Sequence, residues 1–172
     1  LTGNLQWPFT YYVPTPYDVV ISEIMADPTP VVGCPDAEYV ELHNRIAFPI
    51  DVGQWKIQSG SSVRTSPAGV VPADSFLVLT VDPLPIEFTG RNAVAVPSFP
   101  ALSNAGGTLR WLSPSEMEIS RVTYDISWYN EASKDDGGWS LELVNPNDVC
   151  NGAANWRACQ SVFGGTPGTT NS

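Results

Sequence analysis

The stretch 36-DAEYVELHNRIAFPIDVGQWKI-57 decides the fold expected for this chain. It contains two runs in which apolar and polar residues alternate, Glu38–His43 and Gln54–Ile57, joined by a short connection that includes Pro49. Alternation with a period of two is typical of a β-strand that has one buried and one solvated face. The stretch therefore predicts a hairpin-like pair of strands at the centre of the domain.

The same alternation assigns each side chain of the two runs to a face of its strand. Those expected to point into the core are Val40, Leu42, Trp55 and Ile57. Those expected to point to solvent are Tyr39, Glu41 and His43. Because the indole of Trp55 is the largest of these apolar groups, we expect it to fill the centre of the core.

Further strand-like runs lie on both sides of this stretch, separated by turns rich in glycine and proline. They cover 17–26, a short segment around Val63, and residues 75–81, 93–96, 108–113, 119–127 and 139–146. No segment of 11 residues shows helical periodicity. Short strands at such spacing predict an all-β fold, an immunoglobulin-like β-sandwich of about eight to nine strands.

The length of 172 residues fits one domain with a short flanking segment. Residues 1–16 are rich in aromatic residues and proline and predict an N-terminal extended arm or linker, and residues 17–172 form the expected domain. The final segment, Gly164–Ser172, has no apolar side chain that could bury it and is expected to be an ordered to frayed end. Because the chain does not begin with Met, we expect a mature protein or a segment of a longer one.

Composition excludes several classes of partner. The chain has 18 acidic and 8 basic residues and a net charge of −10, so its surface repels nucleic-acid phosphates and anionic lipid headgroups. No apolar run approaches the roughly 20 residues that a membrane-spanning helix needs. We therefore expect no nucleic-acid partner and no membrane insertion.

The three cysteines leave their pairing open. Cys150 and Cys159 enclose eight residues, a loop that a disulfide closes at small entropic cost, and are the favoured pair, with Cys34–Cys150 as the alternative. A disulfide would indicate an oxidising compartment and hence export. The third cysteine is expected to be a buried, inert thiol.

No set of residues in the sequence predicts catalysis. His43 is the only histidine, its strand places it on a sheet face, and no glycine-rich loop precedes a helix, so we expect no enzyme and no organic cofactor. A calcium site is considered where Glu23 and Glu41 are expected on neighbouring strands, with Asp27 and Asp36 at the strand ends. The alternative is two solvated carboxylates, or one that is paired with Arg64 or Arg121.

Aromatic residues next to turns are the candidates for a binding surface. Trp7, Trp128, Tyr129 and Trp156 lie outside the best core runs, where aromatic rings can stack on sugars or anchor a protein partner. Trp128 and Tyr129, followed by Asn130, are the first choice. The alternative is that these rings cover the ends of the sandwich.

An ordered set of segments resembles the lamin tail domain, in the branch found in exported proteins of the Bacteroidetes type. In chain order the segments are VVISEIMADP, DAEYVELHN, PIDVGQWKI, SFLVLT, LSNAGGTLRWL and WSLELVNP, followed by NWRA and GGTPGTTNS. They span residues 17–172. The resemblance implies an immunoglobulin-like sandwich used as a module of a larger secreted or cell-surface protein.

The resemblance also assigns roles to single positions. It places Leu102–Asn104 in the turn before a strand, Trp139 and Leu141 on the last strand, and the glycines of Gly164–Gly168 where the domain closes. The animal relatives link nuclear filaments to chromatin, but this chain is acidic and has no coiled-coil heptads. The expected function is a non-catalytic binding or structural module that contacts a protein or a cell-surface polymer, and the alternative is a carbohydrate- or calcium-assisted adhesion domain.

Overall fold

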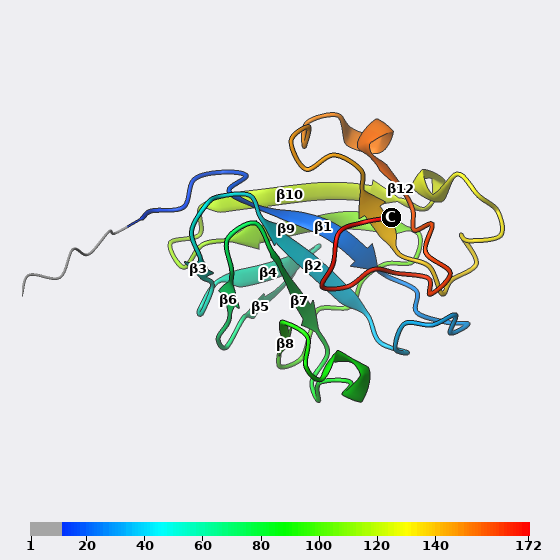
Figure 1. Cartoon of the computed structure of the whole chain (residues 1–172), viewed down its shortest axis with the longest axis horizontal. Helices are drawn as coiled ribbons and strands as arrows, with labels where there is room; N and C mark the ends of the chain where they lie inside the picture. The colour runs from blue at the N-terminus through cyan, green and yellow to red at the C-terminus, as the bar shows by residue number, and fades with distance from the viewer. Residues whose placement is uncertain (1–11) are drawn as a thin grey trace, which may run out of the picture.

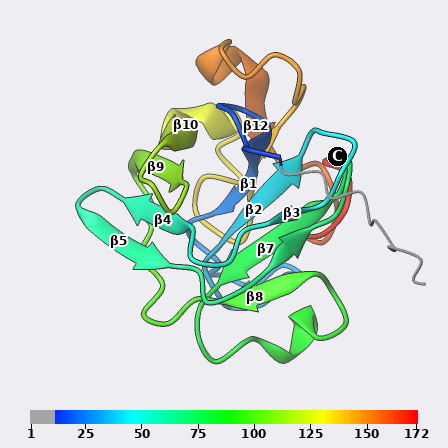
Figure 2. The same cartoon turned by 90° about the vertical axis from the view of Figure 1, so that its left-hand side faces the viewer.

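The computed structural model describes residues 12–172, which form an all-β sandwich (Figure 1). One sheet has six strands in the order β12-β11-β1-β2-β7-β8, and the facing sheet has four in the order β10-β9-β4-β5. A two-stranded ribbon of β3 and β6 accompanies them. Figure 2 shows the two layers from the side, with β4 and β5 on one side and β1, β2, β7 and β8 on the other.

The elements of the described chain are short. The strands are β1 (Val19–Met25), β2 (Tyr39–Asn44), β3 (Ile50–Asp51), β4 (Lys56–Ser59), β5 (Ser62–Thr65), β6 (Val70–Val71), β7 (Phe76–Thr80), β8 (Ala93–Ala95), β9 (Gly106–Leu112), β10 (Glu118–Asp125), β11 (Leu141–Leu143) and β12 (Trp156–Ala158). Three 3₁₀ helices are η1 (Ile86–Phe88), η2 (Ile126–Tyr129) and η3 (Gly152–Asn155). The twelve strands in residues 12–172 exceed the predicted eight to nine, because strands of two or three residues are too short to show alternation.

The two runs of the central stretch belong to opposite sheets. β2 pairs with β1 and β7 in the six-stranded sheet, whereas β4 pairs with β5 and β9 in the four-stranded sheet. The prediction of a hairpin-like pair is therefore wrong. The connection, which contains β3, carries the chain from one layer to the other and so allows both runs to face the same core.

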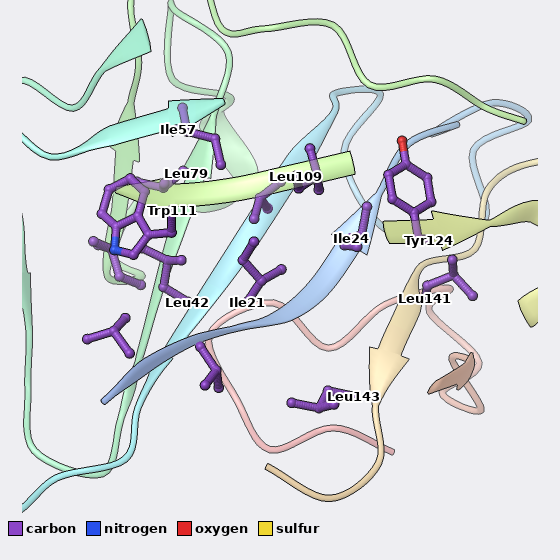
Figure 3. Packing of buried hydrophobic residues seen from close by; sticks show 14 of the residues in the cluster. Ile21, Ile24, Leu42, Ile57, Leu79, Leu109, Trp111, Tyr124, Leu141 and Leu143 are labelled. Atoms are coloured by element: carbon purple, nitrogen blue, oxygen red, sulfur yellow. The ribbon is translucent and has the colours of Figure 1, made fainter. Parts of the chain in front are cut away.

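The core predicted from the central stretch is confirmed. Val40, Leu42 and Ile57 are fully buried, and Trp55 is almost so. The ring of Trp55 lies 5.6 Å from that of Trp111, the largest fully buried side chain. Figure 3 shows Trp111 and Leu109 of β9 packed with Leu42 and Ile21 of the facing sheet. Each aliphatic side chain buried in this way contributes about 1.5–3 kcal/mol to folding.

The residues predicted to face solvent from β2 are buried as well, so that part of the prediction is wrong. Tyr39 and Glu41 have no exposed surface, and His43 is 9% exposed. Their side of the six-stranded sheet is covered by other parts of the chain. The ring of Tyr39 packs edge-on against Phe88 of η1 at 5.7 Å, and the last residues of the chain cross β1 and β2 (Figure 1).

The predicted N-terminal arm is described from Tyr12 on, and residues 1–11 lie outside the described part of the chain. The ring of Tyr12 lies 5.1 Å from that of Phe48, and its hydroxyl donates a hydrogen bond to Asp18. The end of the predicted arm is thus packed on the domain. Within residues 12–172 there is no helix with the length and apolar content of a membrane span.

Candidate functional site

Three glutamates lie side by side on the outer face of the six-stranded sheet. Glu23 of β1 is in register with Glu41 of β2 on one side and with Glu142 of β11 on the other. Residues in register on neighbouring strands point to the same face, with their Cβ atoms about 5 Å apart. All three have no exposed surface. We refer to Glu23, Glu41 and Glu142 as the glutamate cradle.

The segment Gly164–Ser172 covers the cradle, and we call it the strap. One backbone N–H of the strap donates to each carboxyl: Thr166 to Glu23 at 2.9 Å, Gly168 to Glu41 at 2.6 Å and Ser172 to Glu142 at 2.9 Å. Such bonds satisfy backbone groups that would otherwise be buried without partners. The expectation of an ordered to frayed end is met in its ordered part and is wrong in its frayed part, because carboxylate acceptors replace the apolar contacts that the segment lacks.

Side chains of the strap add further contacts to the sheet. The hydroxyls of Thr166 and Ser172 donate to Glu142 at 2.6 and 2.7 Å. The amide of Asn171 donates to the carbonyl oxygens of Ser22 and Leu143, both at 2.9 Å. The strap is thus held across three strands, β2, β1 and β11, without joining the sheet as a strand.

Glycine is required where the strap approaches the cradle most closely. A Cβ atom on Gly165 would lie 2.4 Å from the Tyr39 hydroxyl, 2.8 Å from the Cys34 sulfur and 2.9 Å from Oε1 of Glu23. Gly164 has a φ of +79°, and a Cβ atom added to it would lie 2.2 Å from the carbonyl oxygen of Gly138. The glycines that the family resemblance places at the domain closure therefore form the tightest contact of the strap.

The sheet itself supplies the remaining donors to the cradle. Tyr39 and Ser140 donate their hydroxyl hydrogens to Oε1 of Glu23 at 2.7 and 2.6 Å, and Ser22 donates to Oε1 of Glu41 at 2.7 Å. Oε2 of Glu23 is buried and has no hydrogen-bond partner. Among the ion pairs formed by residues 12–172, none includes a carboxyl of the cradle.

Burial without a cation favours the protonated carboxyl. Burial raises the pKa of Glu23 to about 7, although its hydrogen bonds with Ser140, Tyr39 and Thr166 act in the opposite direction. Burial, followed by the neighbouring charge of Glu23, raises the pKa of Glu41 well above its usual range. Glu23 and Glu41 therefore bind a proton more tightly than an exposed glutamate does.

A groove of about 430 Å³ lies beside the strap. Gly165–Pro167 and Thr169 line it on the side of the strap, and Glu87, Phe88 and Arg91 line it as well, together with Cys34. Arg91 donates to the carbonyl oxygen of Pro167 at 2.6 Å, so it links these two sets of residues. Burial raises the pKa of the Cys34 thiol to about 11, which keeps the sulfur protonated and weakly nucleophilic at neutral pH.

Two loops that line this groove through Gly33 and Phe163 carry exposed apolar side chains, and we call Val31, Val32, Val162 and Phe163 the apolar rim. Phe163, 64% exposed, lies over Gly33, and Val32 lies over Gly138 and Gly164. Val162 is 78% exposed. Clustered apolar exposure of this kind is typical of surfaces that bind another protein.

The predicted aromatic binding surface is largely internal. Tyr129 and Trp156 are buried in the core, and the Tyr129 hydroxyl donates to the carbonyl oxygen of Trp139 at 3.0 Å. Trp128 is half-buried, with its ring 6.1 Å from that of Trp156. Their rings close one end of the sandwich, as the alternative interpretation holds, so Tyr129 and Trp156 offer no stacking surface. Trp7 lies outside the described residues.

The predicted calcium ligands are not brought together. Asp27 accepts a hydrogen bond from the Asn104 amide at 2.6 Å and caps the turn at Thr29, whereas Asp36 is exposed. Within the described chain no three His, Cys, Asp or Glu side chains are arranged to hold a metal ion. Glu23 and Glu41 are neighbours, as predicted, but they bind the strap.

The predicted disulfide is not formed. Cys34, Cys150 and Cys159 are all free thiols. Cys159 is buried after β12, where its sulfur accepts from the Ser161 N–H at 3.3 Å, whereas Cys150 is exposed before η3. The eight residues between them form η3 and β12, where the sequence predicts a short loop closed by a disulfide.

His43 lies at a second, smaller cavity of about 240 Å³, which Ser22 and Asp74 also line. The imidazole stacks on Phe76 at 4.6 Å, and its Nε2 lies 3.4 Å from Asp74. Burial lowers the pKa of His43, so the ring is neutral at pH 7. Because Ser22 donates its hydroxyl hydrogen to Glu41, it is not in the hydrogen-bonded arrangement of a nucleophile and a histidine base.

Comparison with models of known protein families gives no match for this chain, and comparison with curated proteins gives none. The resemblance to lamin tail domains therefore rests on the ordered motifs alone. Glu23 and Glu41 were predicted to be neighbours, but Glu142 and the burial of all three were not. A signal is present in the sequence, because Glu41 and Glu142 each lie between two apolar residues and Glu23 precedes Ile24.

Proposed function

We propose that this chain is a non-catalytic binding module of a secreted or cell-surface protein, and that it holds a protein partner at the groove beside the strap. The observation that carries this proposal is the apolar rim, with Val162 78% and Phe163 64% exposed next to a groove of about 430 Å³. An apolar side chain in such a groove removes both surfaces from water, which supplies most of the affinity of small protein contacts.

The charge of the chain defines the partner further. With a net charge of −10, the molecule attracts a segment that carries basic residues around its apolar anchor. The lamin-tail resemblance supports a modular, immunoglobulin-like role. The export of the protein is part of the same proposal, and it rests on that resemblance, because the three free thiols remove the disulfide argument.

Selection of peptides from a phage-displayed random library on the intact chain tests this proposal. We expect the selected peptides to combine an apolar anchor with lysine or arginine. Titration calorimetry should show at least tenfold weaker binding to Phe163→Ser. The matched control is Val63→Ser, which removes an exposed valine from β5 in the other sheet and should leave the affinity unchanged.

Two results would overturn the proposal. One is equal loss of binding in Phe163→Ser and Val63→Ser, which would indicate non-specific apolar adhesion. The other is a set of peptides that bind Phe163→Ser as tightly as the unmodified chain, which would place the binding surface elsewhere.

A further inference from the structure

The two sheets of the sandwich differ in the charge of their side chains. The strands of the four-stranded sheet contain four basic and two acidic side chains, and those of the six-stranded sheet contain one basic and three acidic side chains. The whole chain has 8 basic and 18 acidic residues, so half of its basic residues lie on four short strands. The net charge of −10 therefore does not describe the four-stranded sheet, which forms one side of the molecule in Figure 2.

A row of polar side chains crosses the outer face of this sheet from strand to strand. Gln58 of β4 is in register with Arg110 of β9, and Arg110 is in register with Arg121 of β10. Residues in register on neighbouring strands point to the same face, with their Cβ atoms about 5 Å apart. Thr108 and Thr123 form a second register pair on this face, with their hydroxyls 3.0 Å apart. Because Arg121 and Thr123 are exposed, the face is an open polar surface.

The two arginines of the row lie directly opposite each other, an arrangement that does not favour folding. Like charges at opposed positions of an antiparallel pair are destabilising. The charge of Arg110 is compensated, because its guanidinium donates to the Glu118 carboxylate and, at 3.3 Å, to Oε1 of Gln58. Arg121 takes part in none of the ion pairs formed by residues 12–172. Its guanidinium is therefore available to an anionic ligand.

We propose that this outer face binds a polysaccharide that carries carboxylate groups, with Arg121 bound to a carboxylate of the ligand. A guanidinium can bind a carboxylate through two parallel N–H···O bonds. The hydroxyls of Thr108 and Thr123 and the amide of Gln58 both donate and accept hydrogen bonds, as binding to sugar hydroxyls requires. The face belongs to the sheet that lies opposite the strap, so this ligand and the protein partner proposed above can be bound at the same time.

The charge of the face fits widely spaced anions better than a nucleic acid. Binding to nucleic acid depends on contacts of many cations with closely spaced phosphates. The cations of this face are Arg110, Arg121 and, one row further along β4, Lys56, and two of them already pair with Glu118 and Glu116. A polysaccharide with one carboxylate for every one or two sugars needs only a few cations. Because exposed charges are screened beyond about 8 Å at physiological salt, the acidic residues elsewhere on the chain oppose such a ligand only weakly.

An acidic peptide fits the face less well than a polysaccharide. Protein contacts are usually anchored by apolar or aromatic side chains at their centre, and extended peptides bind sheet edges through their backbone. The centre of this face consists of Gln58, Arg110 and Arg121, on strands whose neighbours on both sides or on one side are already paired. The exposed apolar side chain in register with Gln58 is Val63, which lies on the edge strand β5.

Titration calorimetry of the intact chain with carboxylated oligosaccharides tests this proposal. The probes are short oligomers of galacturonate, guluronate and glucuronate, in a buffer with EDTA so that calcium does not bridge the carboxylates. We expect at least one of these acids to bind, and its methyl ester, which has the same sugars without the charge, to bind at least tenfold more weakly. Added salt should weaken the binding of the acid.

Variants of Arg121 locate the site. Arg121→Gln should weaken the binding of the acid at least tenfold, and Arg121→Lys should weaken it less, because lysine keeps the charge but not the planar pair of donors. The matched control is Arg157→Gln, which removes an exposed arginine from β12 in the other sheet and should leave the affinity unchanged. Since Arg121 opposes Arg110 and has no acidic partner, Arg121→Gln should not lower the melting temperature.

Several results would overturn the proposal. They are the absence of binding to all three acids, an equal loss of affinity in Arg121→Gln and Arg157→Gln, and a lower melting temperature of Arg121→Gln, which would give this arginine a structural role. Tighter binding of a glutamate peptide or of single-stranded DNA than of every sugar acid would assign the face to another class of ligand. Phe163→Ser should not change the affinity for the acid, so the failure of this proposal is distinguishable from failure of the function proposed above.

Discussion

The outer faces of the two sheets differ although their sequences alternate in the same way. On the four-stranded sheet, Thr108 and Thr123 face each other across β9 and β10 with their hydroxyls 3.0 Å apart, and Thr123 is exposed. On the six-stranded sheet, Glu23 and Glu41 occupy equivalent outward positions and are fully buried. Alternation thus assigns a polar residue to one face of its strand, but it does not show whether that face is exposed to solvent.

The largest effect expected from this difference is a dependence of stability on pH. The rise in the pKa of Glu23 from 4.5 to about 7 corresponds to about 3 kcal/mol. A raised pKa in the folded state means that the protonated carboxyl favours folding. The contribution of Glu23 to the free energy of unfolding should therefore be greatest below pH 4.5 and should decrease as the pH rises through 7. Urea unfolding at pH 5, 6, 7 and 8 measures the decrease, and a flat profile over this range would contradict it.

A smaller effect is expected from adding one methyl group under the strap. Gly165→Ala places a Cβ atom 2.4 Å from the Tyr39 hydroxyl, so the strap must shift and lose hydrogen bonds, at a cost of about 2–3 kcal/mol. Gly107→Ala is the matched control on the four-stranded sheet, because its nearest neighbour lies at 3.8 Å. Thermal unfolding of both variants checks the difference, and equal melting temperatures would show that the strap tolerates the shift.

The smallest effect is expected when one glutamate on each outer face is neutralised. Glu118 pairs with Arg110 at a partly exposed site, so Glu118→Gln should destabilise the protein by less than about 1 kcal/mol at pH 8. Glu41→Gln removes a buried group whose pKa is raised, so it should stabilise the protein more at pH 8 than at pH 5. Chemical unfolding at the two pH values distinguishes the variants, and opposite signs at pH 8 are the expected result.

The sequence was sufficient to predict the all-β sandwich and the inner face of the central stretch. Val40, Leu42 and Ile57 could be assigned because alternation is a local property of a strand. The contact of Trp55 with Trp111 could not, because Trp55 directly precedes β4, Trp111 lies in β9, and their contact depends on the register of these two strands.

The burial of the cradle could not be predicted for a similar reason. The segment that covers the cradle, Thr166–Ser172, lies more than a hundred residues after Glu41 in the sequence. It has no apolar pattern that would indicate burial. The burial of Tyr129 and Trp156 was missed because both lie next to turns, where aromatic rings can be either exposed or internal. Only the contacts of the folded chain decide between these alternatives.

The hydrogen bond from Arg91 to Pro167 has a consequence for any molecule that enters the groove. Because the strap forms one wall, the groove exists in its present shape only while the strap is seated on the sheet. A ligand that needs this wall therefore stabilises the seated strap, and a change that weakens the seating of the strap weakens the ligand by the same free energy.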